Sequence, residues 1–420
     1  MHEPWVPVRC CDVDLAADAE PAGWFGAGTA GSSAGPLLVL ARLHTRVLTV
    51  VSLPRAGSHV DLVAQVAAVS RDEVAAHSAT WGCAPEDADP PCLQERVRLL
   101  TGRPSVSVVI ATRERPDELA ACLESVLAQE VVPDEIVVVD NAPATDRTRR
   151  LVSEFADRGV RYVLEPRAGL ANAHNAGLAA AVHEIVAITD DDVLVDRYWV
   201  AALLEAFAGA ADIGCVTGLI LPVELRTREQ SWVEEYGGFA RGFRMRSSSL
   251  ATPPSDQPLF PFAAGRLGSG ANMAFRRSAL EAIGGFDGAL GAGTKARGGD
   301  DLAAFAEVVL AWATLVYQPD AVVRHRHRSD LESVRRMATG YGVGLGAYLT
   351  SLAVRRPSVV PAMCRRAPGA VRHLLGRRST KNSGISTDYP RELVWAERRG
   401  VIAGPFSYFA SRRSLRAGGH

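Results

Sequence analysis

Three consecutive carboxylates, Asp190, Asp191 and Asp192, are the residues of this chain best suited to chemistry. They follow an apolar run at residues 185–189, which has the length and composition of a buried strand. Adjacent anions repel one another, so a strand end gains nothing from three of them unless a cation binds there. Side chains at i and i+2 of a strand share one side, where Asp190 and Asp192 would suit a hard divalent ion that also holds phosphate oxygens. The triplet indicates a metal–diphosphate site; a solvated turn that caps the next helix is the open alternative.

A sheet is predicted to position this triplet. Strand-like runs lie at residues 106–111, 135–139, 160–164, 184–189 and 213–219, with helical patterns between them at residues 116–129, 145–157, 170–182 and 197–208. Such alternation is typical of an α/β fold with a mostly parallel sheet and helices on both faces. Ligands of these sheets bind beyond the carboxyl ends of the strands, which here carry the triplet, Asp140 and residues 112–114.

Three zones are predicted along the chain. Residues 1–102 carry a strand-like run at 37–53 and then a helical pattern, which predicts a small α/β region whose role the sequence does not indicate. Residues 103–330 hold the main α/β domain, and within it the aromatic, Gly- and Pro-rich connection 222–265 is typical of a lid or binding loop. Residues 331–420 predict a helical extension, whose dispersed arginines are typical of a solvated face.

Composition limits the classes of protein. The chain has 420 residues, of which 47% are hydrophobic, enough for two or three packed units. Its 46 Lys and Arg residues balance 47 Asp and Glu residues, so the charge does not indicate a nucleic-acid partner. The first residues lack the basic start and apolar core of a signal peptide, and no apolar stretch is long enough for a transmembrane segment. We therefore expect a cytoplasmic protein, with peripheral contact at the inner membrane face left open.

Seven cysteines, an odd number without a framework spacing, favour reduced thiols over a disulfide scaffold. Cys83 and Cys92 are too far apart for a zinc knuckle. The spacing of Cys and His residues therefore predicts no zinc site, and we expect structural roles for these thiols.

The motifs of residues 105–328 resemble, in their order, those of the family 2 glycosyltransferases. They are TRER and VVVDNA after strands, GLANAHNAG, TDDD after a strand, GSGANMAFRR, GGFD, GGDDL and HRH. The resemblance implies a GT-A fold and transfer of a sugar from a nucleoside-diphosphate sugar to an acceptor hydroxyl. It also implies Mn²⁺ or Mg²⁺ as cofactor, and a sugar, lipid-linked or small-molecule acceptor.

The resemblance also implies a nucleotide site. Asp140 matches the aspartate that accepts a hydrogen bond from the base, a role that suits the ring N–H of uracil, thymine or guanine; a helix N-cap is the alternative. Thr112, Arg113 and Glu114 match the first loop around the nucleotide, with a salt-bridged surface loop as the alternative.

The metal site implied by the resemblance consists of Asp190, Asp192 and His325, with the ion neutralising the departing diphosphate. Asp190 also lies near the ribose in this reading. Asp191 belongs to the donor site, although its side chain is expected to diverge from the ion. His327 is the alternative to His325, and a surface role is open for both.

Asp301 matches the general base that deprotonates the acceptor hydroxyl, so that attack inverts the anomeric centre. Asp300 beside it would raise its pKa by like-charge repulsion. Acids also favour the first turn of a helix, which is the competing explanation.

Two loops add candidate donor contacts. In the first, His174 stands where the family often has Arg, so Arg167 is a candidate for the diphosphate cation, and Asn175 keeps the pattern. In the second, Gly270 and Asn272 are expected to shape the sugar pocket, because glycine lets the backbone approach a ligand. Helix packing and a tight strand start are the respective alternatives.

Two rival functions remain open. A nucleotidyltransferase also uses metal and nucleotide on an α/β domain, but it usually has a Gly-rich loop after the first strand, and TRERPDE has no glycine. A non-catalytic nucleotide-sugar-binding protein would be expected to lose its acids first, and Asp190, Asp192 and Asp301 are all present. A dehydrogenase is disfavoured because no GxGxxG follows a strand.

Overall fold

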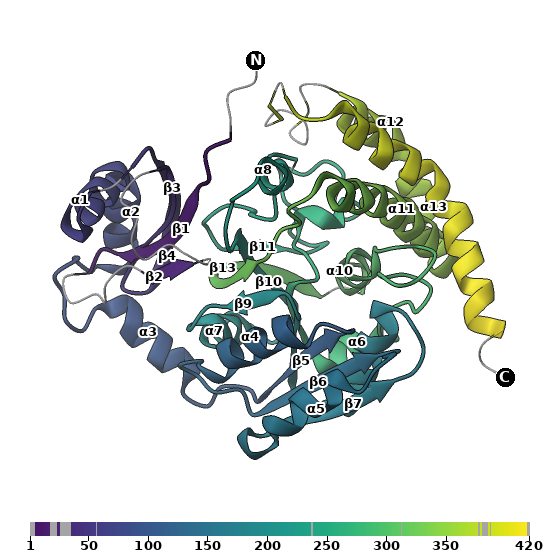
Figure 1. Cartoon of the computed structure of the whole chain (residues 1–420), viewed down its shortest axis with the longest axis horizontal. Coiled ribbons are helices and arrows are strands. Elements are labelled where there is room, and N and C mark those ends of the chain that lie inside the picture. The colour runs from purple at the N-terminus through teal and green to yellow at the C-terminus, as the bar shows by residue number, and fades with distance from the viewer. Residues whose placement is uncertain are drawn as a thin grey trace.

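A computed structural model describes residues 5–16, 23–25, 35–55, 57–236, 238–311, 313–376, 379, 385–386 and 388–417. Figure 1 shows a central α/β part, with a small purple α/β unit on one side and yellow-green C-terminal helices on the other. The expected mixed α/β architecture with a helical C-terminal region is therefore confirmed.

The central sheet has nine strands in the order β11-β13-β10-β12-β8-β5-β6-β7, with β9 paired to β13. Their bounds are β5 Val106–Thr112, β6 Glu135–Asn141, β7 Val160–Glu165, β8 Ile185–Asp190, β9 Val193–Val195, β10 Ile213–Pro222, β11 Arg246–Ser248, β12 Asn272–Arg276 and β13 Thr314–His325. The pairs β5–β6, β5–β8, β6–β7 and β10–β13 are parallel, whereas β12, β9 and β11 run antiparallel to their neighbours. The sheet is thus mostly parallel, as predicted.

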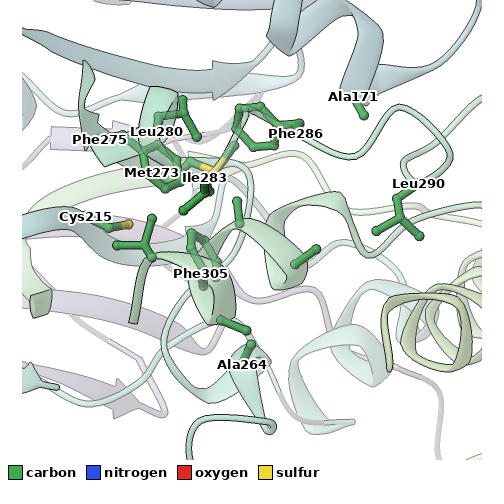
Figure 2. Packing of buried hydrophobic residues seen from close by; sticks show 14 of the residues in the cluster. Ala171, Cys215, Ala264, Met273, Phe275, Leu280, Ile283, Phe286, Leu290 and Phe305 are labelled. Atoms are coloured by element: carbon green, nitrogen blue, oxygen red, sulfur yellow. The ribbon is translucent and has the colours of Figure 1, made fainter. Parts of the chain in front are cut away.

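Helices cover both faces of this sheet because its strands are apolar on both sides. The helices are α4 Pro116–Leu127, α5 Arg147–Glu154, α6 Leu170–Ala180, α7 Trp199–Ala208, α9 Arg277–Ala282 and α10 Asp300–Leu310. Val108 and Ile110 of β5 pack with α4 and α7, while Val109 faces α6, where a Cβ on Gly177 would lie 2.3 Å from its side chain. Figure 2 shows part of the second face, where Phe275 lies between Phe286 and Phe305.

The connection 222–265 differs from the expected irregular loop. It contains the helix α8, Arg228–Glu235, which begins at a complete capping box formed by Thr227 and Gln230. It also contributes β11, so part of the connection is integral to the sheet.

The N-terminal region forms its own four-stranded sheet, in the order β2-β1-β3-β4. Its elements are β1 Arg9–Asp14, β2 Gly23–Phe25, β3 Leu37–Leu43, β4 Arg46–Leu53, α1 His59–Val69, α2 Arg71–Trp81 and α3 Pro91–Leu100. The predicted run at 37–53 is a hairpin whose turn residues, His44 and Thr45, have positive φ angles of 52° and 65°. Asp14 stabilises this strained turn because its carboxylate accepts both turn N–H groups, at 3.0 and 2.6 Å.

Buried charges join this region to the central sheet. Arg46 pairs with Glu205 of α7 at 2.6 Å and with Asp320 of β13 at 3.0 Å, and all three side chains are less than 10% exposed. An apolar cluster of Leu40, Val47, Leu219, Leu221 and Val322 continues the contact. Removing one partner of such a buried pair typically costs about 3–5 kcal/mol, because the remaining charge is left buried without a partner.

All seven cysteines are free thiols, and two of them lie close to two histidines although the spacing along the chain gave no sign of it. His44, His77, Cys83 and Cys92 are buried together, with one potential ligand atom of each within 4.8 Å of the others. Spacing along the chain could not show this, because the hairpin turn and two helices bring the residues together.

The C-terminal helices are α11 Leu331–Arg355, α12 Val360–Leu375 and α13 Arg391–Ala417. Most of their arginines are exposed, as predicted, but one face of α11 and one face of α13 are buried. Gly346 and Gly404 let α11 and α13 approach so closely that a Cβ on Gly404 would lie 2.5 Å from the Cα of Gly346. None of the helices in the described ranges is long and apolar enough to cross a bilayer.

Candidate functional site

A cavity of about 1690 Å³ opens at the carboxyl end of β8. Asp190, Gly270, Asp301 and His325 line it, and the C-terminal helix α11 contributes Tyr341. The elements that carry the predicted acids therefore meet at one site, and the C-terminal extension closes its wall.

The three acids of the triplet diverge. β8 ends at Asp190, which lines the large cavity, and a turn follows. Asp191 accepts from Thr112 Oγ1 at 2.7 Å and from Arg115 at 3.0 Å, so its side chain is directed to the first loop. Asp192 lines a smaller adjoining cavity of about 240 Å³, where it meets Arg115 at 3.1 Å and Arg328 at 3.2 Å. Asp190 and Asp192 were expected to share one side of a strand. Because β8 ends at Asp190 and a turn follows, their side chains line different cavities instead.

Burial and crowding raise the pKa of Asp190 and of Asp191. Burial, followed by the charges of Asp192 and Asp191, raises the pKa of Asp190 well above its ordinary value. Burial also raises the pKa of Asp191, although Arg115 opposes this. Such a set of crowded carboxyl groups is stabilised in its ionised form by an added cation.

His325 is the histidine that faces this acidic cluster. Its Nε2 lies 3.5 Å from Asp192 Oδ1, and burial lowers its pKa to about 4, so the ring is neutral near pH 7. His327 lies 2.9 Å from His325 through its Nδ1 and 2.5 Å from Glu234 Oε1 through its Nε2. Both nitrogens of His327 are therefore engaged, which leaves His325 as the better potential ligand.

Asp192 and His325 fit a hard divalent ion by type and distance, since carboxylate and neutral imidazole are both suitable donors. With Asp190 they do not form a set whose ligand atoms all lie within 4.8 Å of one another among the described residues. An ion at this place would take its remaining ligands from water or phosphate oxygens, as Mg²⁺ commonly does.

Asp301 presents a half-buried carboxylate to the large cavity. Its oxygens accept from the backbone N–H of Gly270 at 2.9 Å and of Leu302 at 2.8 Å. Burial and the charge of Asp300 raise its pKa to about 6. The helix α10 takes Gly299 as its N-cap without a side-chain hydrogen bond, so neither aspartate serves as the cap.

His174 lies beneath this pair, with its Nδ1 3.3 Å from Asp300 Oδ2 and its ring against Phe286. It is almost completely buried, and it also lines the cavity. His174 therefore lies against Asp300 at the wall of the cavity.

Asp140 is fully buried at the end of β6. Tyr162 donates a hydrogen bond to its Oδ2 at 2.9 Å, and burial raises its pKa. Its Oδ1 has no partner of standard geometry among the residues described. The N-cap of α5 is Asp146, so the alternative role for Asp140 does not apply.

The predicted residues of the first loop, 112–114, differ in their contacts. Thr112 holds Asp191, and the Glu114 carboxylate accepts from the N–H groups of Ala144 and Thr145 at 2.7 and 2.9 Å. These hydrogen bonds also lower the pKa of Glu114. Arg113 is exposed. Glu114 thus fixes the neighbouring loop rather than offering a free carboxylate to a ligand.

Three other predicted donor contacts have side chains committed elsewhere. Asn272 donates to the carbonyls of Leu219 and Ala321 in the core, at 3.0 and 2.7 Å. Asn175 forms two 2.8 Å hydrogen bonds with the backbone of Phe286. Exposed Arg167 forms a bidentate pair with Glu165, both contacts at 2.9 Å. Backbone groups thus hold the amides of Asn175 and Asn272, and a carboxylate holds Arg167, while their contacts with a donor stay predictions.

Sequence reasoning missed Arg115, Arg328 and Tyr341. The two arginines are the cations next to the triplet, and Arg115 could have been found because it directly follows the loop residues already considered. Tyr341 lines the cavity from α11, where no local pattern distinguishes it. Trp232 lines the same cavity and packs edge-on against Tyr389, 6.2 Å between ring centroids.

Comparisons with known proteins agree with this architecture. The family model described as Glycosyl transferase family 2 matches residues 107–284. Similar relatives include a pre-mycofactocin glycosyltransferase of Mycobacterium tuberculosis, 30% identical over 60% of this chain and 48% of the relative. A glucosyl-dolichyl phosphate glucuronosyltransferase of Haloferax volcanii is 26% identical over 43% of this chain and 56% of the relative. The chain thus spans about half the length of the curated relatives it matches.

Among solved structures, a mannosyltransferase of Pyrobaculum calidifontis in complex with GDP-Man and Mn²⁺ has a TM-score of 0.44. It is 21% identical, and the match covers 78% of this chain and 82% of that one.

Proposed function

We propose that this chain, whose residues 107–284 match the model described as Glycosyl transferase family 2, transfers a sugar from a nucleoside-diphosphate sugar to an acceptor hydroxyl, with inversion of the anomeric centre. The observation that carries the proposal is the shared cavity of Asp190, Asp301 and His325. Asp301, with its raised pKa, and Asp190, the first acid of the triplet, face the same space.

The donor nucleotide is assigned to the end of β6. Asp140 offers a buried acceptor oxygen to a ring N–H, which favours uracil, thymine or guanine over cytosine or adenine. Arg115 and Arg328 lie beside Asp192 and provide positive charge for the diphosphate, in place of Arg167.

Asp192 and His325, with Asp190 nearby, would hold Mn²⁺ or Mg²⁺. When bound, such an ion stabilises the negative charge that develops on a departing diphosphate. The two arginines orient the same group and share its charge.

Asp301 acts as the general base in this proposal. It removes the proton from the acceptor hydroxyl while that oxygen attacks the anomeric carbon from the side opposite the diphosphate. The backbone N–H groups of Gly270 and Leu302 hold the carboxylate in place. Like-charge repulsion from Asp300 makes Asp301 a stronger base.

The acceptor enters from the side of the cavity walled by Trp232 and by apolar residues of α11 and α12, such as Met337, Leu345 and Met363. This mixed surface is compatible with the three proposed acceptor classes: a sugar, a lipid-linked molecule or a small molecule.

The pH dependence of kcat/KM should report the ionisation of Asp301. A base acts only when deprotonated, so kcat/KM should fall about tenfold per pH unit below about pH 6. Asp300→Asn removes the neighbouring negative charge, which lowers the pKa of Asp301. The fall of kcat/KM on the acidic side of the pH profile should therefore move to lower pH. Rate profiles of the two proteins would test the assignment, and an acidic fall that does not move would contradict it.

A thermal-shift screen of nucleoside diphosphates with and without manganese tests the donor site. At about 100-fold excess over Kd, a bound ligand adds about 2.7 kcal/mol, which should raise Tm by roughly 3 °C or more. We expect this for at least one of UDP, dTDP and GDP in the presence of manganese, and a smaller rise without it. A response confined to ADP or CDP, or none at all, would oppose the proposal.

A further inference from the structure

Four residues outside the cavity form a second cluster of potential ligands, in the N-terminal region. His44 lies in the β3–β4 turn and His77 in the last turns of α2. Cys83 follows Gly82, the left-handed residue that ends α2, and Cys92 lies in the first turn of α3. Figure 1 shows β3, β4 and α2 in the purple unit and α3, in blue, below it.

The spacing of the ligand atoms suits a tetrahedral ion. One atom of each residue lies within 4.8 Å of the other three, and Cys92 Sγ is 3.6 Å from His44 Nδ1. Zinc bonds of about 2.0–2.3 Å place the corners of a tetrahedron about 3.3–3.8 Å apart. The four side chains therefore need only small movements to contact one ion.

Burial makes the cluster difficult to explain without a ligand. The exposed fractions of His44, His77, Cys83 and Cys92 are 4%, 8%, 4% and 0%. The Nε2 atom of His77 is buried and has no hydrogen-bond partner in the part of the chain that is described. Unpartnered polar atoms in a protein interior are costly, and native proteins usually satisfy them.

We propose that His44, His77, Cys83 and Cys92 bind a structural zinc ion. Two cysteines and two histidines are a common closed set for zinc, and all four positions are filled by protein. On binding, each thiol releases its proton, and two thiolates with two neutral imidazoles neutralise the ion.

The charges next to the cluster are already balanced. Arg46 and Arg96 pair with Glu205 and Asp320, and Arg46 also donates to the backbone carbonyl of Cys92 at 2.9 Å. A neutral zinc site leaves this balance unchanged, whereas an unneutralised cation would disturb it.

The ion would fasten the N-terminal region to the transferase domain. It would join the β3–β4 turn, the end of α2 and the start of α3, and α3 contacts α7 of the central sheet. The buried ion pairs of Arg46 lie at the same junction. This role is separate from the proposed transfer reaction, so either proposal can fail without the other.

Metal analysis of the full chain, purified without added zinc or chelator, tests the site. We expect about one zinc ion per chain by mass spectrometry, and at least a tenfold lower content in Cys92→Ser and in His77→Ala. Cys364→Ser, at an exposed cysteine, is the matched control and should keep its zinc. Asp192→Ala should also keep it, which separates this ion from any metal at the triplet.

Two measurements on the unmodified chain keep the test decisive if the variants fail to fold. Zinc should be released when the thiols react with an organomercurial, and replacement by cobalt(II) should give the thiolate charge-transfer and d–d bands of a tetrahedral site. Unmodified protein without zinc, zinc retained in Cys92→Ser, or a Cys83–Cys92 disulfide in fresh protein would each overturn the proposal.

Discussion

Asp301→Asn is expected to lower the rate of sugar transfer by at least about a hundredfold, the scale of a lost general base. The amide cannot take the proton of the acceptor hydroxyl, whereas the substitution changes volume very little. Donor binding should remain nearly intact, because Asp140, Arg115 and Arg328 are unaffected. Single-turnover transfer and nucleotide titration, measured on the same protein, separate the two effects.

The amide also weakens one of the backbone hydrogen bonds that Asp301 accepts from Gly270 and Leu302, so Tm must be measured in parallel. Asp157→Asn, an exposed acid in a turn, is the matched control and should transfer sugar normally. Undiminished transfer by Asp301→Asn would remove this residue from the role of base.

Asp192→Ala is expected to abolish the metal-dependent part of donor binding. Asp192 is the carboxylate closest to His325, and the loss of a direct ligand should weaken the response to manganese by at least about a hundredfold. The variant also frees Arg115 and Arg328 from their anionic partner, so binding without metal should persist or increase. Calorimetry of UDP or GDP, with manganese and with chelator, measures the two parts.

Asp157→Ala controls for the removal of a carboxylate in general. An unchanged affinity of Asp192→Ala for both nucleotides in manganese would show that no ion acts at the triplet. The catalytic proposal would then have to rest on the arginines alone.

Much of the central sheet could be predicted because each element carries its own periodicity. The strands β5, β6 and β8 and the helices α4 and α6 lie within a few residues of their predicted bounds. The antiparallel course of β12 was not foreseen, since strand direction depends on partners that are distant in sequence. The helix α8 was missed although its capping box, Thr227 to Gln230, is a local signal.

In the candidate site, too, some residues could be predicted from the sequence and others could not. The triplet could be named because it follows a buried strand, whereas Asp140 and Asp301 were given their roles through the family resemblance, and they lie at the end of β6 and the start of α10. Asn175 and Asn272 were assigned to the donor, but the structure uses their amides to satisfy buried backbone groups.

Local patterns along the chain determined the α/β class, the strand ends and the acidic residues, because these depend on hydrogen bonds and burial within a few residues. Folding in three dimensions decided which histidine faces Asp192, which helix walls the cavity, and that Cys92 meets His44 across 48 positions of sequence. Contacts between residues that are distant in sequence depend on how separate elements pack. The sequence of one segment does not determine them, because the free energy of packing depends on all the elements involved.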